Sequence, residues 1–134
     1  MTISAVIKSG TDKHDVVVTT AGNDKTLAIP GKAVGGGSAI NGGELLFAAL
    51  ATCFCNDVYR EAAKREWVLQ SVEVTVTGEF GKEGEPGSNI RYTAQVEAPA
   101  LSKEQIDELI TYVDTVAEVH NTLRKGVEVS LKMT

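Results

Sequence analysis

The chain of 134 residues has no apolar run long enough to cross a membrane and no run of basic residues. A membrane-spanning helix needs roughly 20 apolar residues, which excludes a membrane span of that kind. The formal net charge is −5, so the chain lacks the positive surface that binding to phosphate groups requires. We therefore expect neither a nucleic acid nor a membrane among its partners.

Cysteine is also scarce, because Cys53 and Cys55 are the only two in the chain. Two cysteines are too few for a disulfide framework. The first ten residues, MTISAVIKSG, lack the charged and then apolar layout of a secretory signal peptide. We therefore expect a cytoplasmic protein, in which ordinary cysteines remain thiols.

The remaining composition, 43% hydrophobic and 23% charged, is typical of a globular protein. We expect a single domain over residues 1–134, because a chain of this length can bury a core of its own. Near the N-terminus, residues 3–7, 16–18 and 26–29 are apolar or β-branched. These segments predict three short strands, arranged as a meander.

A glycine-rich segment, PGKAVGGGSAINGG, follows these strands. Its residue order differs from the phosphate-binding pattern G-x-x-x-x-G-K-[ST], so a flexible loop that lets backbone pass close to a neighbour is the favoured interpretation. Asn41 and Glu44 then have the spacing of a capping box at the start of a helix. Residues 45–55, LLFAALATCFC, are apolar all round, which predicts a central helix buried on every side. This helix is expected to end near Trp67.

Two alternating segments follow, around residues 72–77 and 90–98, and the turn-rich GKEGEPGSN joins them as a long hairpin. Ser102, with Gln105 three residues on, is expected to cap a second helix that continues to Gly126. Residues 127–133 alternate again and predict a last strand. The expected order is βββ-α-ββ-α-β, an α+β fold with a mostly antiparallel sheet around the central helix.

The stretch NGGELLFAALATCF (41–54), the hairpin and AEVHNTLRKGVEVSL (117–131) resemble the OsmC/Ohr family. These are the osmotically inducible and organic hydroperoxide resistance proteins. The resemblance implies an OsmC-like fold and an intertwined homodimer with two active sites at the subunit interface. It also implies that a buried thiolate in each site reduces an organic peroxide. Cys53 falls at the position of the family's peroxide-attacking cysteine.

In three places the sequence departs from the family's pattern, as in a divergent member. Ala117 and Glu118 occupy the Cys-Pro motif that carries the resolving cysteine. The family uses an arginine from the N-terminal strands, whereas this chain has no arginine before Arg60. Gly43 stands where the family has its catalytic glutamate, and Glu44 lies one position further on. Glu44 is therefore a candidate catalytic carboxylate and equally a helix cap.

Cys53 needs an activating group, because the thiolate and not the thiol attacks a peroxide. It lies about twelve residues into the expected helix, roughly 18 Å from its N-terminus, where the helix dipole has faded. A cation must therefore come from elsewhere. The candidates are Arg60, on the same helix face, Arg124, after the second helix, and Lys8, Lys13 or His14 from the N-terminal region.

Cys55 lies about 200° around the helix from Cys53, so the two side chains diverge. A disulfide between them would need the helix to unwind. Two thiols also fall short of a four-ligand zinc site, and neither His14 nor His120 has ligand spacing to them, so we expect no metal and no cofactor. His120 continues an apolar stripe and is expected to be a satisfied core or interface histidine.

From the residues alone, the favoured interpretation is that Cys53 and Cys55 are two small core residues. The resemblance instead favours Cys53 as a reactive thiol, with Cys55 as a neighbour whose part in the reaction is open. The expected function is a thiol-dependent peroxidase for stress defence, which takes small organic hydroperoxides and an external thiol reductant. Phe47, Leu50 and Phe54 surround Cys53 with apolar side chains in the sequence. We therefore expect organic hydroperoxides to be preferred over hydrogen peroxide, because an apolar pocket favours an apolar peroxide. The alternative is a non-enzymatic dimer of the same fold that binds a small apolar ligand.

Overall fold

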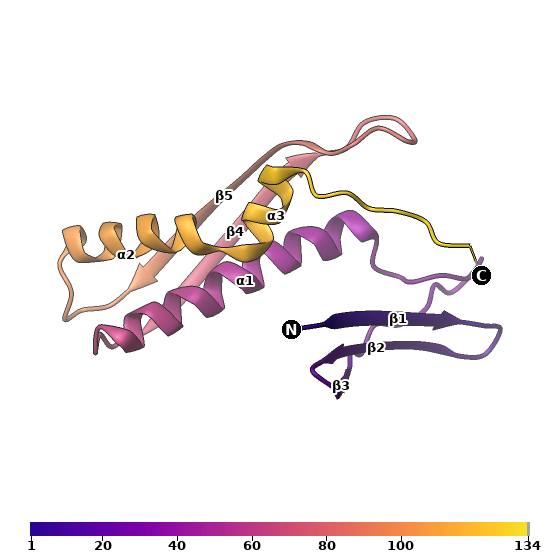
Figure 1. The fold of residues 1–134 in the computed structure, drawn as a ribbon, viewed down its shortest axis with the longest axis horizontal. Helices are drawn as coiled ribbons and strands as arrows, with labels where there is room; N and C mark the ends of the chain where they lie inside the picture. The colour runs from indigo at the N-terminus through magenta and orange to yellow at the C-terminus, as the bar shows by residue number, and fades with distance from the viewer. Residues whose placement is uncertain (134) are drawn as a thin grey trace. The chain divides into compact units, whose positions relative to one another are not determined.

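A computed structural model describes residues 1–133 of the chain, which forms two compact units (Figure 1). The first unit comprises Met1–Leu45 and the second begins at Leu46. Three strands are followed by a long helix, two strands and two shorter helices. No helix among the described residues is long and apolar enough to span a membrane.

The first unit contains an antiparallel sheet in the order β1-β2-β3. Its strands are β1 (Ile3–Ser9), β2 (His14–Thr20) and β3 (Asn23–Thr26), which confirms the expected meander. The third strand, however, lies earlier than the predicted residues 26–29. Ala21 and Gly22 both have positive φ, 49° and 80°, as in the tight two-residue turns that join hairpin strands. Because pairing resumes directly after this turn, β3 begins at Asn23 and ends at Thr26.

The glycine-rich loop of the first unit folds back on itself. Gly31 and Ser38 form an isolated antiparallel bridge, and the amide of Lys32 donates to the Gly37 carbonyl at 2.9 Å. Gly35, Gly36 and Gly37 have φ values of 97°, 77° and 83°. Three successive residues with positive φ are accessible only to glycine at low cost, so the backbone conformation accounts for the glycines here.

The long helix α1 (Gly42–Lys64) begins with the expected capping box. The Glu44 amide donates to Asn41 Oδ1 at 2.8 Å, and the Asn41 amide donates to Glu44 Oε1 at 2.9 Å. These reciprocal bonds satisfy two backbone donors that the helix itself leaves free.

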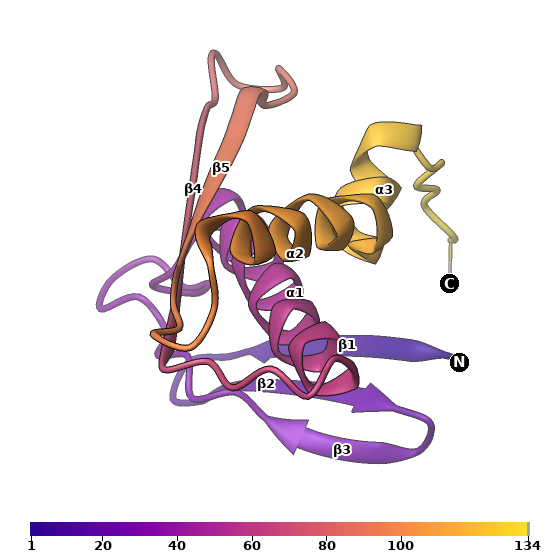
Figure 2. The same ribbon diagram turned by 90° about the vertical axis from the view of Figure 1, so that its left-hand side faces the viewer.

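The prediction that residues 45–55 are buried on every side is wrong for the single chain. Ala48, Ala49 and Thr52 are exposed, and burial follows one stripe with a spacing of four residues. That stripe consists of Leu50, Phe54, Val58 and Ala62. Within the second unit, a two-stranded ribbon and a second helix pack against this buried stripe of α1 (Figure 2).

The second unit is built on the expected hairpin of β4 (Ser71–Glu79) and β5 (Ser88–Glu97). Helices α1 and α2 lie on the same face of this ribbon (Figure 2). Cross-strand pairs such as Val72 with Val96 and Val74 with Ala94 face the helices. The fully buried cluster between these layers contains Phe54, Val58, Ala62, Leu109, Val113 and Ala117.

The predicted second helix is in fact two helices, α2 (Lys103–Val116) and α3 (Glu118–Lys125). The Ser102–Gln105 capping box at the start of α2 is confirmed. The chain bends at Ala117, which is fully buried and has an extended backbone with ψ of 106°. Two hydrogen bonds hold the bend: Asn121 Nδ2 donates to the Thr115 carbonyl and Arg124 Nη1 to the Asp114 carbonyl, both at 3.1 Å. They satisfy carbonyl groups that the end of α2 leaves without partners.

The predicted last strand at residues 127–133 is absent from the described part of the chain. Its alternating apolar side chains are exposed, with exposed fractions from 55% at Val127 to 96% at Val129. A strand requires a neighbour that accepts and donates its backbone hydrogen bonds. The prediction of a strand is therefore wrong for the described residues, which provide no partner strand for this segment.

Candidate functional site

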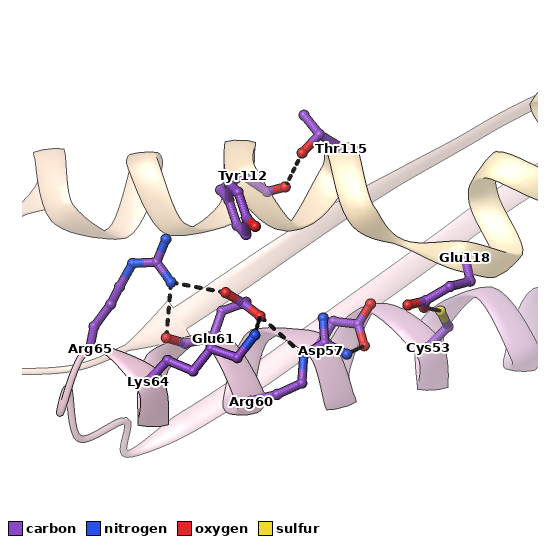
Figure 3. A network of polar contacts seen from close by, with 9 residues as sticks. All are labelled: Cys53, Asp57, Arg60, Glu61, Lys64, Arg65, Tyr112, Thr115 and Glu118. Atoms are coloured by element: carbon purple, nitrogen blue, oxygen red, sulfur yellow. Dashed lines mark hydrogen bonds and ion pairs between the residues drawn. The ribbon is translucent and has the colours of Figure 1, made fainter.

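Cys53 lies half-buried on α1, opposite the first residue of α3 (Figure 3). Its thiol donates to Glu118 Oε2, with the sulfur and the oxygen 3.8 Å apart. Asp57 follows Cys53 by one helical turn on the same face of α1. One ligand atom from each of Cys53, Asp57 and Glu118 lies within 4.8 Å of the other two. The site is thus a thiol beside two carboxyl groups.

The surroundings of Cys53 favour its protonated form. Burial raises the pKa of the thiol, and the negative charges of Asp57 and Glu118 raise it further. The backbone hydrogen bond from Val119, in the first turn of α3, acts in the opposite direction and does not outweigh them. Since the thiol is a poor nucleophile, burial and these two carboxyl groups do not activate Cys53.

Asp57 is 5% exposed and has only one of its two carboxylate oxygens satisfied. Oδ1 accepts a hydrogen bond from Arg60 Nη1 at 2.6 Å, whereas Oδ2 has no hydrogen-bond partner among residues 1–133. Burial raises the pKa of Asp57; the charge of Arg60 lowers it, and the charge of Glu118 raises it again. Burying this carboxylate is therefore unfavourable to folding, because one of its oxygens has lost water without gaining a hydrogen bond.

Glu61, one turn further along α1, shows the opposite situation. It is 3% exposed, and its carboxylate oxygens accept from Lys64 at 2.9 Å, Arg60 at 3.1 Å and Arg65 at 3.2 Å. These hydrogen bonds, with that of Lys64 the largest contribution, lower the pKa of Glu61 to about 2. Two neighbouring buried acids thus differ sharply in how well the chain satisfies them.

The structure does not place the two arginine candidates on the sulfur. The Arg60 guanidinium is engaged by Asp57 and Glu61. Arg124 binds Asp114, Nη2 to Oδ1 at 2.7 Å, in a separate polar group to which the Tyr92 hydroxyl also donates. The role of either arginine in activating Cys53 remains a prediction.

The other predicted site residues make contacts of their own. Glu44 forms the capping box of α1, which is the structural one of the two roles predicted for it. Both cysteines are free thiols. Cys55 lines an open hollow of about 290 Å³ with Ala51, Thr52, Asn56 and Val74. In the first unit, His14 bonds to the hydroxyl groups of Ser9 and Ser38, and Lys13 pairs with Asp15.

His120 is buried, as expected, but it is not satisfied. Its ring packs 4.6 Å from the ring of Tyr92 and 5.8 Å from that of Phe54, measured between centroids. Neither ring nitrogen has a hydrogen-bond partner among the described residues. Burial, followed by the charge of Arg124, lowers the pKa of His120, which keeps the ring neutral.

Sequence reasoning missed both carboxyl groups at Cys53. The spacing of four residues between Cys53 and Asp57 was a usable signal, because such residues are neighbours on a helix. Glu118 gave no such signal, since its position depends on the bend at Ala117. Among residues 1–133, Cys53, Asp57 and Glu118 are the group of acidic, cysteine and histidine side chains close enough to hold a metal ion.

Residues 35–132 match the protein family described as OsmC-like protein, so the chain belongs to the OsmC-like family. Solved structures with the same fold include an OsmC-like protein from Mycoplasma pneumoniae, with a TM-score of 0.61 and 20% identity, covering 90% of this chain and 87% of that one. The organic hydroperoxide resistance protein OhrB of Bacillus subtilis has a TM-score of 0.56 and 19% identity, with 100% and 98% covered.

An organic hydroperoxide resistance protein from Elizabethkingia anophelis has a TM-score of 0.61 and 20% identity, with 96% of this chain and 91% of that chain covered. At these identities the likeness establishes the α+β fold. A comparison with curated protein sequences finds no match.

Proposed function

We propose that the protein is a thiol-dependent peroxidase that reduces organic hydroperoxides through Cys53, as part of a cytoplasmic stress defence. Membership of the OsmC-like family supports this, as do similar structures described as organic hydroperoxide resistance proteins. The observation that carries the proposal is the position of Cys53. Its half-buried sulfur lies where α1 meets α3, with a carboxylate 3.8 Å away that can accept its proton.

In the proposed reaction the Cys53 thiol first transfers its proton to the Glu118 carboxylate. The thiolate then attacks the terminal oxygen of the hydroperoxide, the O–O bond breaks, and the leaving alkoxide takes a proton to become the alcohol. Cys53 is oxidised to a sulfenic acid. An external thiol condenses with it, releasing water, and a second thiol then frees Cys53 as its own disulfide forms.

The thiolate also needs a cation, because burial and two carboxyl groups raise the pKa of Cys53. Arg60 would have to release Asp57 to reach the sulfur. Arg124 and the N-terminal residues Lys8, Lys13 and His14 are the other candidates. The N-terminal residues would act from the second subunit of a homodimer.

We also propose that the protein is a homodimer, with the uncovered faces of the chain at the interface. The edge strand β1 exposes apolar side chains, with Ile3 63% and Val6 61% exposed. Residues 127–133 expose a further alternating apolar row. An edge strand with exposed apolar side chains invites pairing with another chain. Light scattering that finds a stable monomer at micromolar concentration would contradict the homodimer.

A second candidate function is the binding of a small apolar ligand without catalysis. The raised pKa of Cys53 favours it, because a thiol at neutral pH reacts slowly with peroxides. Tyr92 and His120 pack on Phe54 in the same core, and His120 carries two unpartnered ring nitrogens among the described residues.

Peroxide consumption by the purified protein with a dithiol reductant separates the two functions. The proposed peroxidase consumes an organic hydroperoxide faster than hydrogen peroxide, loses this activity in Cys53→Ser and retains most of it in Cys55→Ser. Equal rates for the wild type and Cys53→Ser would end the enzyme proposal.

A further inference from the structure

Three potential metal ligands from two helices converge at Cys53. The sulfur, one Asp57 oxygen and one Glu118 oxygen all lie within 4.8 Å of one another, and the sulfur and Glu118 Oε2 are 3.8 Å apart. Ligand atoms around a tetrahedral zinc ion are roughly 3.5 Å apart, given bonds of about 2.0–2.3 Å. Glu118 is exposed, so its side chain can close the remaining distance by a change of rotamer.

Asp57 supplies a second and independent observation. Its side chain is 7% exposed, and Oδ2 is buried without a hydrogen-bond partner among residues 1–133. In Figure 3 the dashed line from Arg60 reaches one Asp57 oxygen, and the other oxygen points towards Glu118 and the Cys53 sulfur. A buried carboxylate oxygen without a donor or a cation is unfavourable, because it has lost its hydration without compensation.

The chain satisfies the neighbouring acid in a different way. Glu61, which is equally buried, has three cationic side chains on its two oxygens. Within the described part of the chain, Asp57 has one cationic partner, Arg60, which also pairs with Glu61. Arg60 contacts Oδ1 of Asp57 and leaves Oδ2 without a hydrogen-bond partner among residues 1–133. This Oδ2 atom points towards the Glu118 carboxylate (Figure 3).

We propose that Cys53, Asp57 and Glu118 form a binding site for a divalent transition-metal ion, of which Zn²⁺ is the best match. A thiolate favours a borderline-soft ion such as zinc over magnesium or calcium, which prefer oxygen ligands alone. Three protein ligands leave a fourth position for water. On binding, the S–H bond breaks, its proton goes to solvent, and the sulfur lone pair forms the bond to the metal.

Such a metal would occupy the sulfur that the proposed peroxidase uses, so the metal-loaded and the peroxide-reducing forms exclude each other. The metal site does not depend on the peroxidase proposal, because binding is measured directly. Peroxide assays on the chelator-treated protein test the enzyme, and titrations with metal test the site. Either can fail while the other stands.

The experiment is a titration of the full chain, freed of metal by a chelator, with Co²⁺ as a spectroscopic substitute for Zn²⁺. We expect one equivalent to produce a near-ultraviolet band from thiolate-to-cobalt charge transfer, and Zn²⁺ to displace it. Cys53→Ser removes the band. Asp57→Asn and Glu118→Gln weaken Zn²⁺ binding at least about tenfold, the smallest loss seen even for groups that only support a ligand. Cys55→Ser and the exposed Glu104→Gln leave the affinity unchanged.

Absence of the band in the wild type would overturn the proposal, as would a band that survives Cys53→Ser. A wild type that binds no metal but gains thermal stability in Asp57→Asn would indicate a proton shared by Asp57 and Glu118 instead. If Asp57→Asn does not fold, Glu118→Gln decides, because Glu118 lies exposed on the surface.

Discussion

The thiol of Cys53 donates to the carboxylate of Glu118, with 3.8 Å between sulfur and oxygen. This contact joins the middle of α1 to the first residue of α3, and it exists because the chain bends at Ala117. A carboxylate therefore lies where a cysteine peroxidase needs a positive charge. This negative charge adds to burial, the main cause, in raising the pKa of Cys53.

Replacing Glu118 with glutamine should make Cys53 ionise more readily. Burial is the main cause of the raised pKa of Cys53, and the charges of Asp57 and Glu118 add to it. Removing one of these charges lowers the pKa of the thiol, so the thiolate fraction at neutral pH rises. The rate at which iodoacetamide alkylates Cys53 across a range of pH, compared between proteins with Glu118 and with Glu118→Gln, measures this change.

Cys55→Ser is the background for that measurement, because it leaves Cys53 as the only thiol. Glu104→Gln serves as the matched control. Glu104 is exposed in the first turn of α2, so this substitution removes one negative charge at a position other than the Cys53 site. If Glu118 accepts the Cys53 proton in the reaction, peroxide turnover in Glu118→Gln falls even though alkylation becomes faster. An alkylation profile that does not move would contradict the electrostatic account.

Glu61 should contribute to stability in a way that depends on pH. Hydrogen bonds, first from Lys64, lower its pKa from 4.5 to about 2 in the folded chain. The charged form is thus favoured by folding, so its contribution is fully present above pH 4.5 and is lost as the pH falls towards 2. Glu61→Gln should therefore unfold more easily at neutral pH and show a shallower loss of stability between these two values.

Urea unfolding at a series of pH values measures the Glu61 effect. Glu83→Gln provides the control, because Glu83 is exposed in the loop between β4 and β5, outside any helix. Equal slopes of stability against pH for Glu61→Gln and the wild type would show that the three cations do not act on Glu61 as the structure indicates.

Gly78 on β4 leaves little room for a side chain, because Phe47 lies against it. A Cβ atom built there would lie 2.5 Å from Phe47 Cζ and 3.1 Å from Ile90 Cγ1. The Phe47 ring is also packed 5.9 Å from the ring of Phe80, which limits its freedom to move away. Gly78→Ala is expected to destabilise the fold by about 1–3 kcal/mol, the usual range for overpacking.

Thermal unfolding of Gly78→Ala measures this loss, and Phe47→Leu supplies the second arm of a double-mutant cycle. If the clash with Phe47 is the cause, Gly78→Ala costs less in the Phe47→Leu background than in the wild type. Strictly additive effects would place the cause elsewhere on the strand.

Local signals predicted much of the fold. Asn41 with Glu44 and Ser102 with Gln105 form the expected capping boxes, because a cap depends on residues three apart. The β4–β5 hairpin followed from alternation, which reflects a single buried face. Each of these features is decided within one element or between two adjacent ones.

The features that sequence reasoning missed depend on contacts between distant elements. The bend before Glu118 is held by side chains of α3 on carbonyls of α2, which no periodicity reveals. Residues 127–133 have the alternating pattern of a strand but pair with no strand in the described part of the chain. The same bend brings Glu118 to Cys53. The periodicity of the sequence could therefore not predict this contact either.

The last prediction concerns oxidised Cys53. Peroxide attack leaves a sulfenic acid, which a resolving thiol traps before further oxidation. Ala117, which the family resemblance places where a resolving cysteine would stand, is fully buried, and Cys55 lines a hollow beside Val74. The sulfenic acid should therefore persist until an external thiol meets it, or oxidise further under excess peroxide. Mass spectrometry after one equivalent of peroxide should find one added oxygen on Cys53; a disulfide between Cys53 and Cys55 would mean that α1 unwinds and that Cys55 resolves the intermediate after all.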